Sequence, residues 1–310
     1  MSAMDTSTEL EYLGLAVQVA GVAVDEVRLP VDRFAAVNGL RIHYLDWEHP
    51  VGRPMLFLHG ARLTAHTFDL VCLPLSSQFR CIAVDSRGHG DSEWAAGGEY
   101  TPQARVADVE ALVGTLGLDD FVLVGMSMGG GTAIGYAGRH SAKLRGLVLV
   151  DTGAPHEEPM ARPGAQRIRD FNGGPGTFAS FDEAIERALA FNPSRDRRLL
   201  RRSLLHAMRQ EPDGSWRWKY DRDGLGNRGP EVGPARAAEQ RESLTRITCP
   251  TLVLRGGSSD MFTDEDAANT VDLLPSGRWV RIDNAGHTIQ GDNPRGMLEA
   301  MAPFLTEIGA

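Results

Sequence analysis

The chain has 310 residues, of which 32 are basic and 41 acidic, so its formal net charge is −9. Hydrophobic residues make up 42% and charged residues 24%, which is typical of a globular protein and argues against a disordered chain. The acidic excess disfavours nucleic acid as a partner, because an acidic surface repels phosphates. No run approaches the roughly 20 apolar residues of a membrane-spanning helix, so we expect no membrane partner.

The cysteine content and the first residues of the sequence indicate the cellular compartment. Three cysteines without Cys-x-x-Cys spacing, an odd number, predict reduced buried thiols and a cytoplasmic protein rather than a disulfide framework or a zinc site. The first five residues lack the basic start and the apolar block of a secretory signal. We interpret residues 1–30 as an N-terminal extension that packs on the rest of the molecule, or on a second copy of the chain in a homodimer.

The segment after the extension contains a hairpin signal. The strand-like runs 34–37 and 41–45 flank Asn38-Gly39. Asn-Gly between two such runs is typical of a tight turn between antiparallel strands. We therefore expect the sheet to open with antiparallel strands.

Six further apolar runs recur along the chain, and each is followed by a polar residue or a glycine. Runs this short suit strands that are covered on both faces in a parallel sheet. They span residues 55–58, 81–84, 121–124, 147–150, 251–254 and 279–282. Stretches of helical spacing lie between them, and in residues 104–116 the apolar side chains fall on one helix face. The alternation predicts an α/β fold with a mostly parallel, doubly wound sheet.

The stretch 153–241 lacks this rhythm. It is rich in arginine and glycine, and its helix-like segments are 182–191 and 197–209. We interpret it as a helical insertion between two strands of the sheet. The remaining segments, 31–152 and 242–310, then form one core domain.

A glycine-flanked serine marks the strongest candidate for chemistry. Gly125-Met126-Ser127-Met128-Gly129 follows an apolar run and precedes a helix-like segment. In the order strand, sharp turn, helix, this G-x-S-x-G pattern exposes the serine hydroxyl as a nucleophile. The N–H of Met128, at the start of the helix, is then the first donor of an oxyanion hole. The alternative is a glycine-rich turn with an incidental serine.

A serine nucleophile needs a base, and the base needs an orienting acid. Of the nine histidines, His287 is the best candidate, because it follows the last strand-like run on a loop that contains a glycine. For the acid we favour Asp260, which follows the run 251–254 and gives the chain order Ser, Asp, His. Asp151, one strand earlier, is the rival, and its alternative role is to cap a loop.

The first parallel strand is followed by His59-Gly60-Ala61-Arg62. A loop here offers a second N–H, that of Ala61, to a developing oxyanion. His59 is expected to hold the loop rather than to transfer protons. Arg62 has two interpretations that the sequence leaves open: it holds a substrate carboxylate or polar ester, or it points into solvent.

The charged segment 85–92 is better explained as a tight loop with an internal Asp–Arg pair than as a metal site. His89 and Asp91 lack further ligands at a suitable spacing. No phosphate-binding glycine loop and no dinucleotide fingerprint is present. We therefore expect no cofactor and no metal.

Taken together and in this order, the motifs resemble the α/β-hydrolase fold superfamily from about residue 34 to 305. The resemblance rests on His59-Gly60, the D-x-R-G-H-G-x-S loop at 85–92, the serine turn at 125–129, the segment from Pro250-Thr251-Leu252 to Gly256 and Asp260, and Gly286-His287. It implies an α/β-hydrolase core, and it implies that 153–241 is a helical cap.

The resemblance also narrows the activity. Ser127 stands where epoxide hydrolases and haloalkane dehalogenases of the superfamily carry an aspartate, so those activities are disfavoured. What it implies is a serine hydrolase that cleaves a carboxylic ester or lactone of a small to medium organic molecule through an acyl-enzyme. The alternatives are a C–C bond hydrolase of the meta-cleavage type, a perhydrolase and a non-catalytic ligand receptor.

Overall fold

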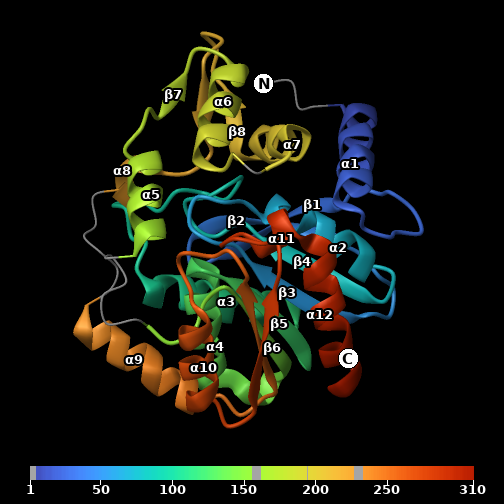
Figure 1. Cartoon of the computed structure of the whole chain (residues 1–310), viewed down its shortest axis with the longest axis vertical. Coiled ribbons are helices and arrows are strands. Elements are labelled where there is room, and N and C mark those ends of the chain that lie inside the picture. The colour runs from blue at the N-terminus through green and yellow to red at the C-terminus, as the bar shows by residue number, and fades with distance from the viewer. Residues whose placement is uncertain (1–4, 156–161, 194, 227–232) are drawn as a thin grey trace.

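A central sheet organises the computed structural model, which describes residues 5–155, 162–193, 195–226 and 233–310. Its eight strands have the order β1-β2-β4-β3-β5-β6-β10-β11. The first two pairings, β1 with β2 and β2 with β4, are antiparallel, and the others are parallel. The predicted α/β fold with a mostly parallel sheet is confirmed (Figure 1).

Every apolar run of the sequence lies within a strand. The strands are β1 (Val31–Val37), β2 (Leu40–Trp47), β3 (Arg53–Leu58), β4 (Phe79–Val84), β5 (Phe121–Met126), β6 (Leu144–Val150), β10 (Thr251–Gly256) and β11 (Gly277–Ile282). All six residues of β5 are buried, as expected for a strand covered on both faces. The predicted hairpin is confirmed, because Asn38 and Gly39 both have positive φ, 48° and 79°, which suits a type I′ turn.

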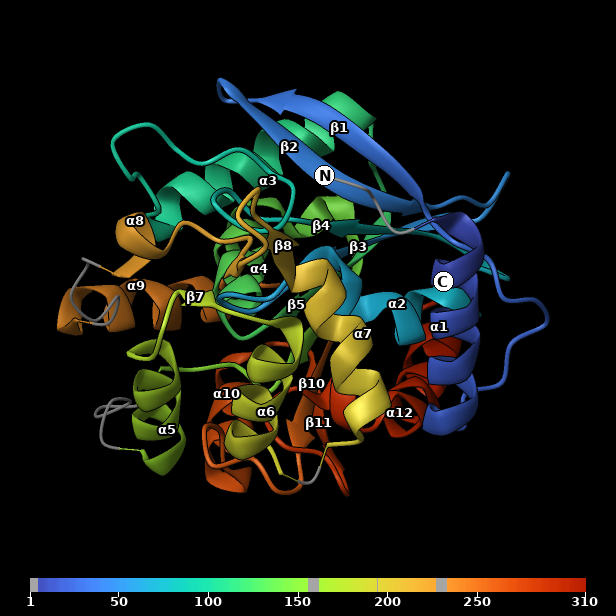
Figure 2. The same cartoon turned by 90° about the horizontal axis from the view of Figure 1, so that it is seen from above.

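Helices cover both faces of the sheet (Figure 2). One face carries α3 (Pro102–Leu116), α4 (Met128–His140), α9 (Pro234–Thr245) and α10 (Asp264–Leu273). The other carries α1 (Thr6–Ala20), α2 (Asp69–Leu75) and α12 (Pro294–Glu307). Shorter turns are η1 (Ala65–Phe68), η2 (Ser141–Lys143) and α11 (Ile289–Asp292). Within the described part of the chain, every helix is too short or too polar to span a membrane.

Helix α1 occupies the N-terminal extension. The side chain of Asp5 caps its first turn by accepting hydrogen bonds from the N–H groups of Ser7 and Thr8. Leu13 is fully buried, and α1 contacts both α2 and a helix of the insertion, α7 (Arg197–Ala207). The extension therefore bridges the two layers of the molecule.

The insertion between β6 and β10 contains both helices and a small sheet. Its helices are α5 (Pro163–Asn172), α6 (Phe181–Phe191), α7 (Arg197–Ala207) and α8 (Arg222–Gly226), and its strands are β7 (Thr177–Phe178), β8 (Met208–Gln210) and β9 (Trp216–Trp218). The segment expected as a helical insertion therefore contains strands as well as helices, since β7, β9 and β8 pair in that order. Its apolar side chains, including those of Ile185 and Trp218, form a separate cluster. Helix α9, which spans the expected boundary at residue 241, packs on α4 of the core.

The loop 85–92 differs from the prediction in its ion pairs. Asp85 does not pair with Arg87. Its carboxylate lies 2.7 Å from Nδ1 of His43 and also accepts the N–H of Ala65. Arg87 binds Asp108 of α3 through two nitrogens instead. The loop is thus tied to its neighbours as well as closed on itself, since the Asp85 carboxylate also accepts the N–H of Asp91 at 2.9 Å.

Candidate active site

Ser127 occupies a strained turn between β5 and α4. Its φ is 51° and its ψ is −114°, which is unusual for a residue with a Cβ. The flanking glycines make the turn sterically feasible. A Cβ at Gly125 would lie 2.6 Å from the carbonyl oxygen of Gly129, and one at Gly129 would lie 2.2 Å from that of Leu58. The sequence therefore forces the serine out of the sheet and towards the carboxyl edge.

The structure brings Ser127 and His287 together from distant parts of the chain. The Oγ of Ser127 lies 3.0 Å from Nε2 of His287, and Nδ1 of the same ring lies 2.7 Å from Oδ2 of Asp151. An ionised carboxylate can only accept, so Nδ1 carries the proton and Nε2 is free to accept from the serine hydroxyl. This is the geometry of a nucleophile, a base and an orienting acid.

Asp151 is held firmly at the end of β6. Its side chain is completely buried. Besides His287, it accepts the Ser259 hydroxyl at 2.5 Å on Oδ2 and the Gly256 N–H at 2.8 Å on Oδ1. These donors fix the orientation of the carboxylate, which suits a group that must hold the His287 ring in place.

The prediction of Asp260 as the orienting acid is corrected by this geometry. The ring of His287 is bonded to Asp151, whereas Asp260 forms an ion pair with Arg167 of α5 at 3.1 Å. The physical reason is that the turn after β10 directs a hydroxyl, that of Ser259, at the site. The available signal was that Asp151 follows β6 directly, and β6 is the neighbour of β5, the strand that precedes Ser127.

The loop after β3 lies against the serine turn. A Cβ at Gly60 would lie 2.4 Å from Sδ of Met126 and 3.3 Å from the Cβ of Ser127, so a larger residue here would have to displace the Met126 side chain. Buried His59 accepts the N–H of Ser86 on Nε2, and Nδ1 therefore donates to the carbonyl of Gly60. Burial lowers the pKa of His59, which keeps the ring neutral. The ring holds the loop that carries Ala61 and Arg62.

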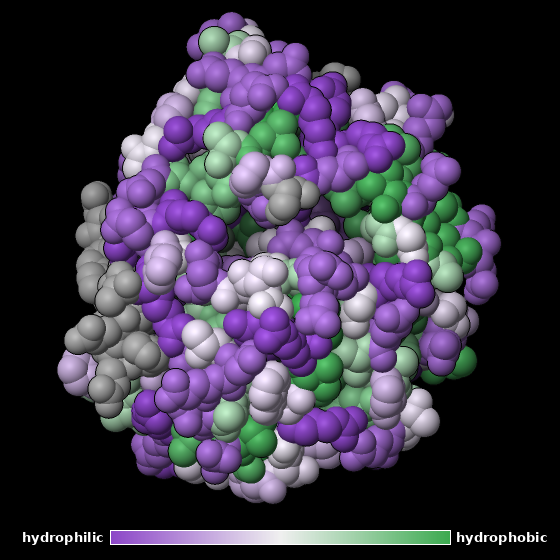
Figure 3. All heavy atoms as spheres, in the orientation of Figure 1, coloured by the Kyte–Doolittle hydropathy of each residue, from purple (hydrophilic) through white to green (hydrophobic). Residues whose placement is uncertain are grey.

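A cavity of about 950 Å³ opens onto Ser127 and His287. Ala61 and Arg62 lie in its wall, whereas Met128 is the first residue of α4 behind the serine. The insertion supplies much of the opposite wall, with apolar side chains from α5 to β9 that include Phe171, Phe191, Leu199, Leu200, Leu204 and Trp218. Figure 3 shows the surface hollowed between the insertion and the core. The sequence alone did not identify which of these side chains face the cavity.

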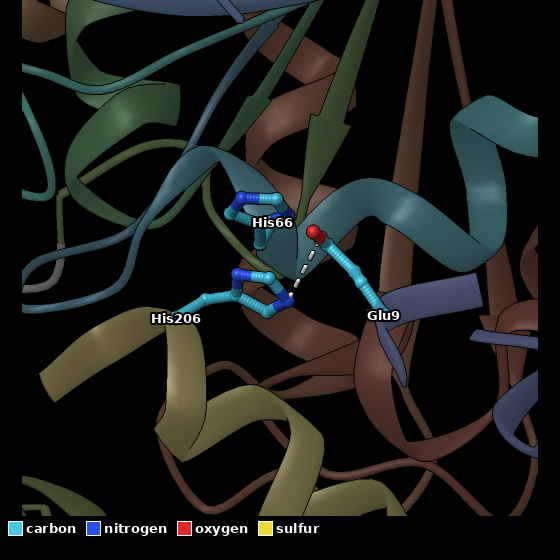
Figure 4. A group of neighbouring side chains, drawn as sticks. All are labelled: Glu9, His66 and His206. Atoms are coloured by element: carbon cyan, nitrogen blue, oxygen red, sulfur yellow. Dashed lines mark ion pairs between the residues drawn. The ribbon is translucent and has the colours of Figure 1, made fainter. Parts of the chain in front are cut away.

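Two side-chain groups in the described residues have metal-ligand composition, and neither presents a formed site. In the first, Glu9, His66 and His206, the ligand atoms lie within 4.8 Å of one another (Figure 4). The two imidazole rings are stacked, however, at 3.5 Å and 20°. Imidazole lone pairs lie in the ring plane, so two stacked rings do not converge on one ion. The group instead joins α1, η1 and α7.

The second group is His43, Asp85 and Asp91. Both ring nitrogens of His43 are already engaged, Nδ1 with Asp85 at 2.7 Å and Nε2 with Asp32 at 3.0 Å. A metal would have to displace one of these carboxylates from a buried ring. The arrangement is a structural hydrogen-bond network.

Comparison with known proteins gives consistent results. The profile described as "Alpha/beta hydrolase family" matches residues 55–300. The chain is 31% identical over 304 residues to the esterase Rv0045c of Mycobacterium tuberculosis, covering 97% of this chain and 98% of that protein. A crystal structure of that esterase superposes with a TM-score of 0.77 at 28% identity, covering 99% of each chain.

Two more distant relatives are also hydrolases. The 3-hydroxybutyrate-oligomer hydrolase of Cupriavidus necator is 30% identical over 260 residues, covering 80% of this chain and 87% of that protein. The 2-(acetamidomethylene)succinate hydrolase of Mesorhizobium japonicum is 27% identical over 267 residues, covering 83% and 90%.

Proposed function

Because the chain belongs to the α/β hydrolase family, we propose that it is a serine hydrolase that cleaves a carboxylic ester or lactone through an acyl-enzyme. One observation carries this proposal: the hydrogen-bonded series Asp151, His287, Ser127 ends at the cavity. Such a series performs acyl transfer on several unrelated folds. The similarity to an esterase along nearly the whole chain supports an ester as the scissile bond.

In the first step, Ser127 Oγ attacks the substrate carbonyl while His287 Nε2 takes the hydroxyl proton. The 3.0 Å separation suits this transfer. Asp151 stabilises the imidazolium, and the Gly256 N–H prevents its carboxylate from turning away. His287 then protonates the leaving alcohol, which departs and leaves the acyl group on Ser127.

In the second step, His287 takes a proton from water as the water oxygen attacks the acyl carbon. The bond to Ser127 Oγ then breaks, the serine recovers its proton from His287, and the acid leaves. In both steps we assign the carbonyl oxygen to the N–H groups of Met128 and Ala61. A donor of this kind contributes roughly 3–4 kcal/mol to transition-state stabilisation.

The cavity supports a small to medium organic substrate. Its volume of about 950 Å³ is within the range of small-molecule sites. In this proposal residues 153–241 act as a cap whose apolar side chains shape the pocket. The three cysteines are free and buried, which favours a reducing compartment such as the cytoplasm.

The experiment compares wild type, Ser127→Ala and the control Ser77→Ala on a panel of p-nitrophenyl esters and lactones. Ser77 follows α2, and its hydroxyl bonds locally to the carbonyl of Pro74. We expect Ser127→Ala to lose at least about a thousandfold in kcat with unchanged folding, because the nucleophile is gone. A fluorophosphonate should label Ser127 in wild type.

Wild-type turnover by Ser127→Ala would refute the proposal. Labelling of Ser127 without ester turnover, but with cleavage of a dienoic diketone, would favour the C–C hydrolase. Labelling of Ser127 without any turnover would show a reactive serine that does not hydrolyse the tested substrates, and would also contradict the ester proposal.

A further inference from the structure

Arg62 is a cavity-lining arginine for which no acidic partner is found in the described parts of the chain. The other two arginines of the wall are paired. Arg167 lies 3.1 Å from Asp260, and Arg195 lies 3.6 Å from Asp292. The wall thus contains one guanidinium whose charge is not balanced by a neighbouring acid.

The acids of the wall do not leave a carboxylate to spare for Arg62. Besides Asp260 and Asp292, the wall contains Asp196, which is bonded to Arg198 at 2.7 Å. Each described acid of the cavity is therefore paired with another arginine.

The surroundings of Arg62 increase its need for an anion. Its guanidinium lies over the ring of Tyr220, 5.5 Å from the centroid, which is a cation–π contact and not a neutralising one. Its Nε is buried and has no hydrogen-bond partner. Burial is the main cause that lowers the pKa of Arg62, and the charge of Arg222 adds to it. An arginine nevertheless stays protonated, so the site holds a partly desolvated cation.

The backbone holds this side chain beside the nucleophile. The N–H of Leu63 donates to the carbonyl of Gly60 at 3.2 Å and closes a turn in which Arg62 has a φ of 63°. Glycine or asparagine usually occupies a turn position with positive φ, because other side chains are strained there. Gly60, at the start of the same turn, abuts Ser127. A bulky arginine is kept in a strained position at the reaction site.

From these observations we propose that Arg62 binds a carboxylate of the substrate, so that the preferred substrates are half-esters or lactones that carry an anionic carboxylate near the scissile bond. This inference rests on the proposed serine hydrolase. The planar guanidinium can donate two parallel hydrogen bonds to a carboxylate. Pairing would also satisfy the buried Nε and remove the cost of an unpaired cation.

The test uses two substrates that differ at one end of the molecule. Mono-p-nitrophenyl adipate carries a carboxylate there, and its methyl ester is neutral. Wild type should prefer the acid. Arg62→Gln should lower kcat/KM for the acid by about tenfold to a hundredfold and change the value for the methyl ester less than about threefold. Arg62→Lys should fall between, because an ammonium keeps the charge and loses the two-pronged geometry.

A binding measurement separates this inference from the proposed function. Free adipate should inhibit or bind wild type more strongly than Arg62→Gln, with the dissociation constant rising by the same factor. Arg139→Gln is the control, because it changes the net charge by the same amount, and Arg139 of α4 pairs with Glu110 of α3 rather than with a residue of the cavity. It should leave both substrates and adipate unaffected.

The inference would be overturned if wild type had the same kcat/KM for the acid and for its methyl ester, or if Arg62→Gln lowered both values equally. Neither result would contradict the proposed serine mechanism. Absence of any Ser127-dependent turnover would overturn the proposed function instead, and adipate binding would still decide the role of Arg62.

Discussion

The carboxylates of Asp151 and Asp260 differ in what holds them. Asp151 is buried and accepts from His287, Ser259 and Gly256, whereas Asp260 is partly exposed beside Arg167. A buried carboxylate on the Nδ1 side of the base selects its tautomer and stabilises its charged form.

We predict that Asp151→Asn lowers kcat by about 10³- to 10⁴-fold, because the amide cannot select the required tautomer of His287. Asp260→Asn should change kcat by no more than a few fold. Steady-state kinetics on one activated ester, with circular dichroism to verify folding, measures both. If the larger loss falls on Asp260→Asn, the acid assigned from the geometry is wrong.

For single residues, the sequence predicted those features of the site that depend only on residues adjacent in the chain. The glycine-flanked serine turn depends on adjacent residues, so the motif placed Ser127 correctly between strand and helix. The partner of His287 depends on which of two neighbouring strand ends, those of β6 and β10, directs a carboxylate inward. That choice is made by the turn around Ser259, whose conformation the spacing of residues does not reveal.

Among the elements, α4 and the end of β3 approach each other closely beside the site. A Cβ at Gly129 would overlap the backbone of Leu58, including its carbonyl oxygen at 2.2 Å. At Gly131, two residues along the same helix, an added Cβ would have nothing within 4 Å. The two positions therefore separate steric contact from helix propensity.

We predict that Gly129→Ala lowers the free energy of unfolding by about 3 kcal/mol or prevents folding, because strand and helix must separate. Gly131→Ala should be neutral or should raise it by up to about 1 kcal/mol, since alanine favours a helix. Urea unfolding of both variants is the measurement. Comparable stability of the two would contradict the close approach of α4 and β3.

Among the larger elements, the strands were predictable because each is a dense apolar run. The paired strands of the insertion were not, since β7 has two residues and β8 and β9 have three each, too few for any periodicity to show. Their stability comes from packing, with Trp218 of β9 in edge contact with Phe178 of β7. Such contacts between short segments are tertiary and leave little trace in spacing.

For the whole molecule, buried histidines determine how stability varies with pH. Burial of His43 disfavours its charged form, but its hydrogen bonds to Asp32 and Asp85 outweigh burial and raise its pKa from 6.5 to about 9. A group with a raised pKa contributes stability that is complete below pH 6.5 and is lost as the pH rises through 9.

We predict that the free energy of unfolding falls by about 3 kcal/mol between pH 6.5 and pH 9 because of His43. In His43→Gln this alkaline loss should disappear, although the variant is less stable throughout because Asp85 loses its partner. Urea unfolding at a series of pH values measures both curves. An alkaline loss of equal size in the variant would assign the effect to other groups.

At acidic pH, buried histidines whose pKa is lowered have the opposite effect on stability. Burial lowers the pKa of His59 and His206, and it lowers that of His89 to about 3. These rings must take up protons on unfolding below pH 6.5, so they favour the unfolded chain there. Together with His43, they place the highest stability near neutral to slightly acidic pH.

Asp151 follows β6, so the carboxylate beside His287 and the part of the cavity wall that follows β10 come from different loops. The last residue of β10, Gly256, contributes a backbone N–H to Asp151, and the turn after it contributes the Ser259 hydroxyl, but neither carries the charge itself. A side-chain exchange at Asp260 can therefore alter the cavity wall without replacing the carboxylate that contacts His287. The backbone of the same turn is less free to change, because the Met261 N–H donates to the Ser259 hydroxyl at 3.2 Å and Thr263 caps α10.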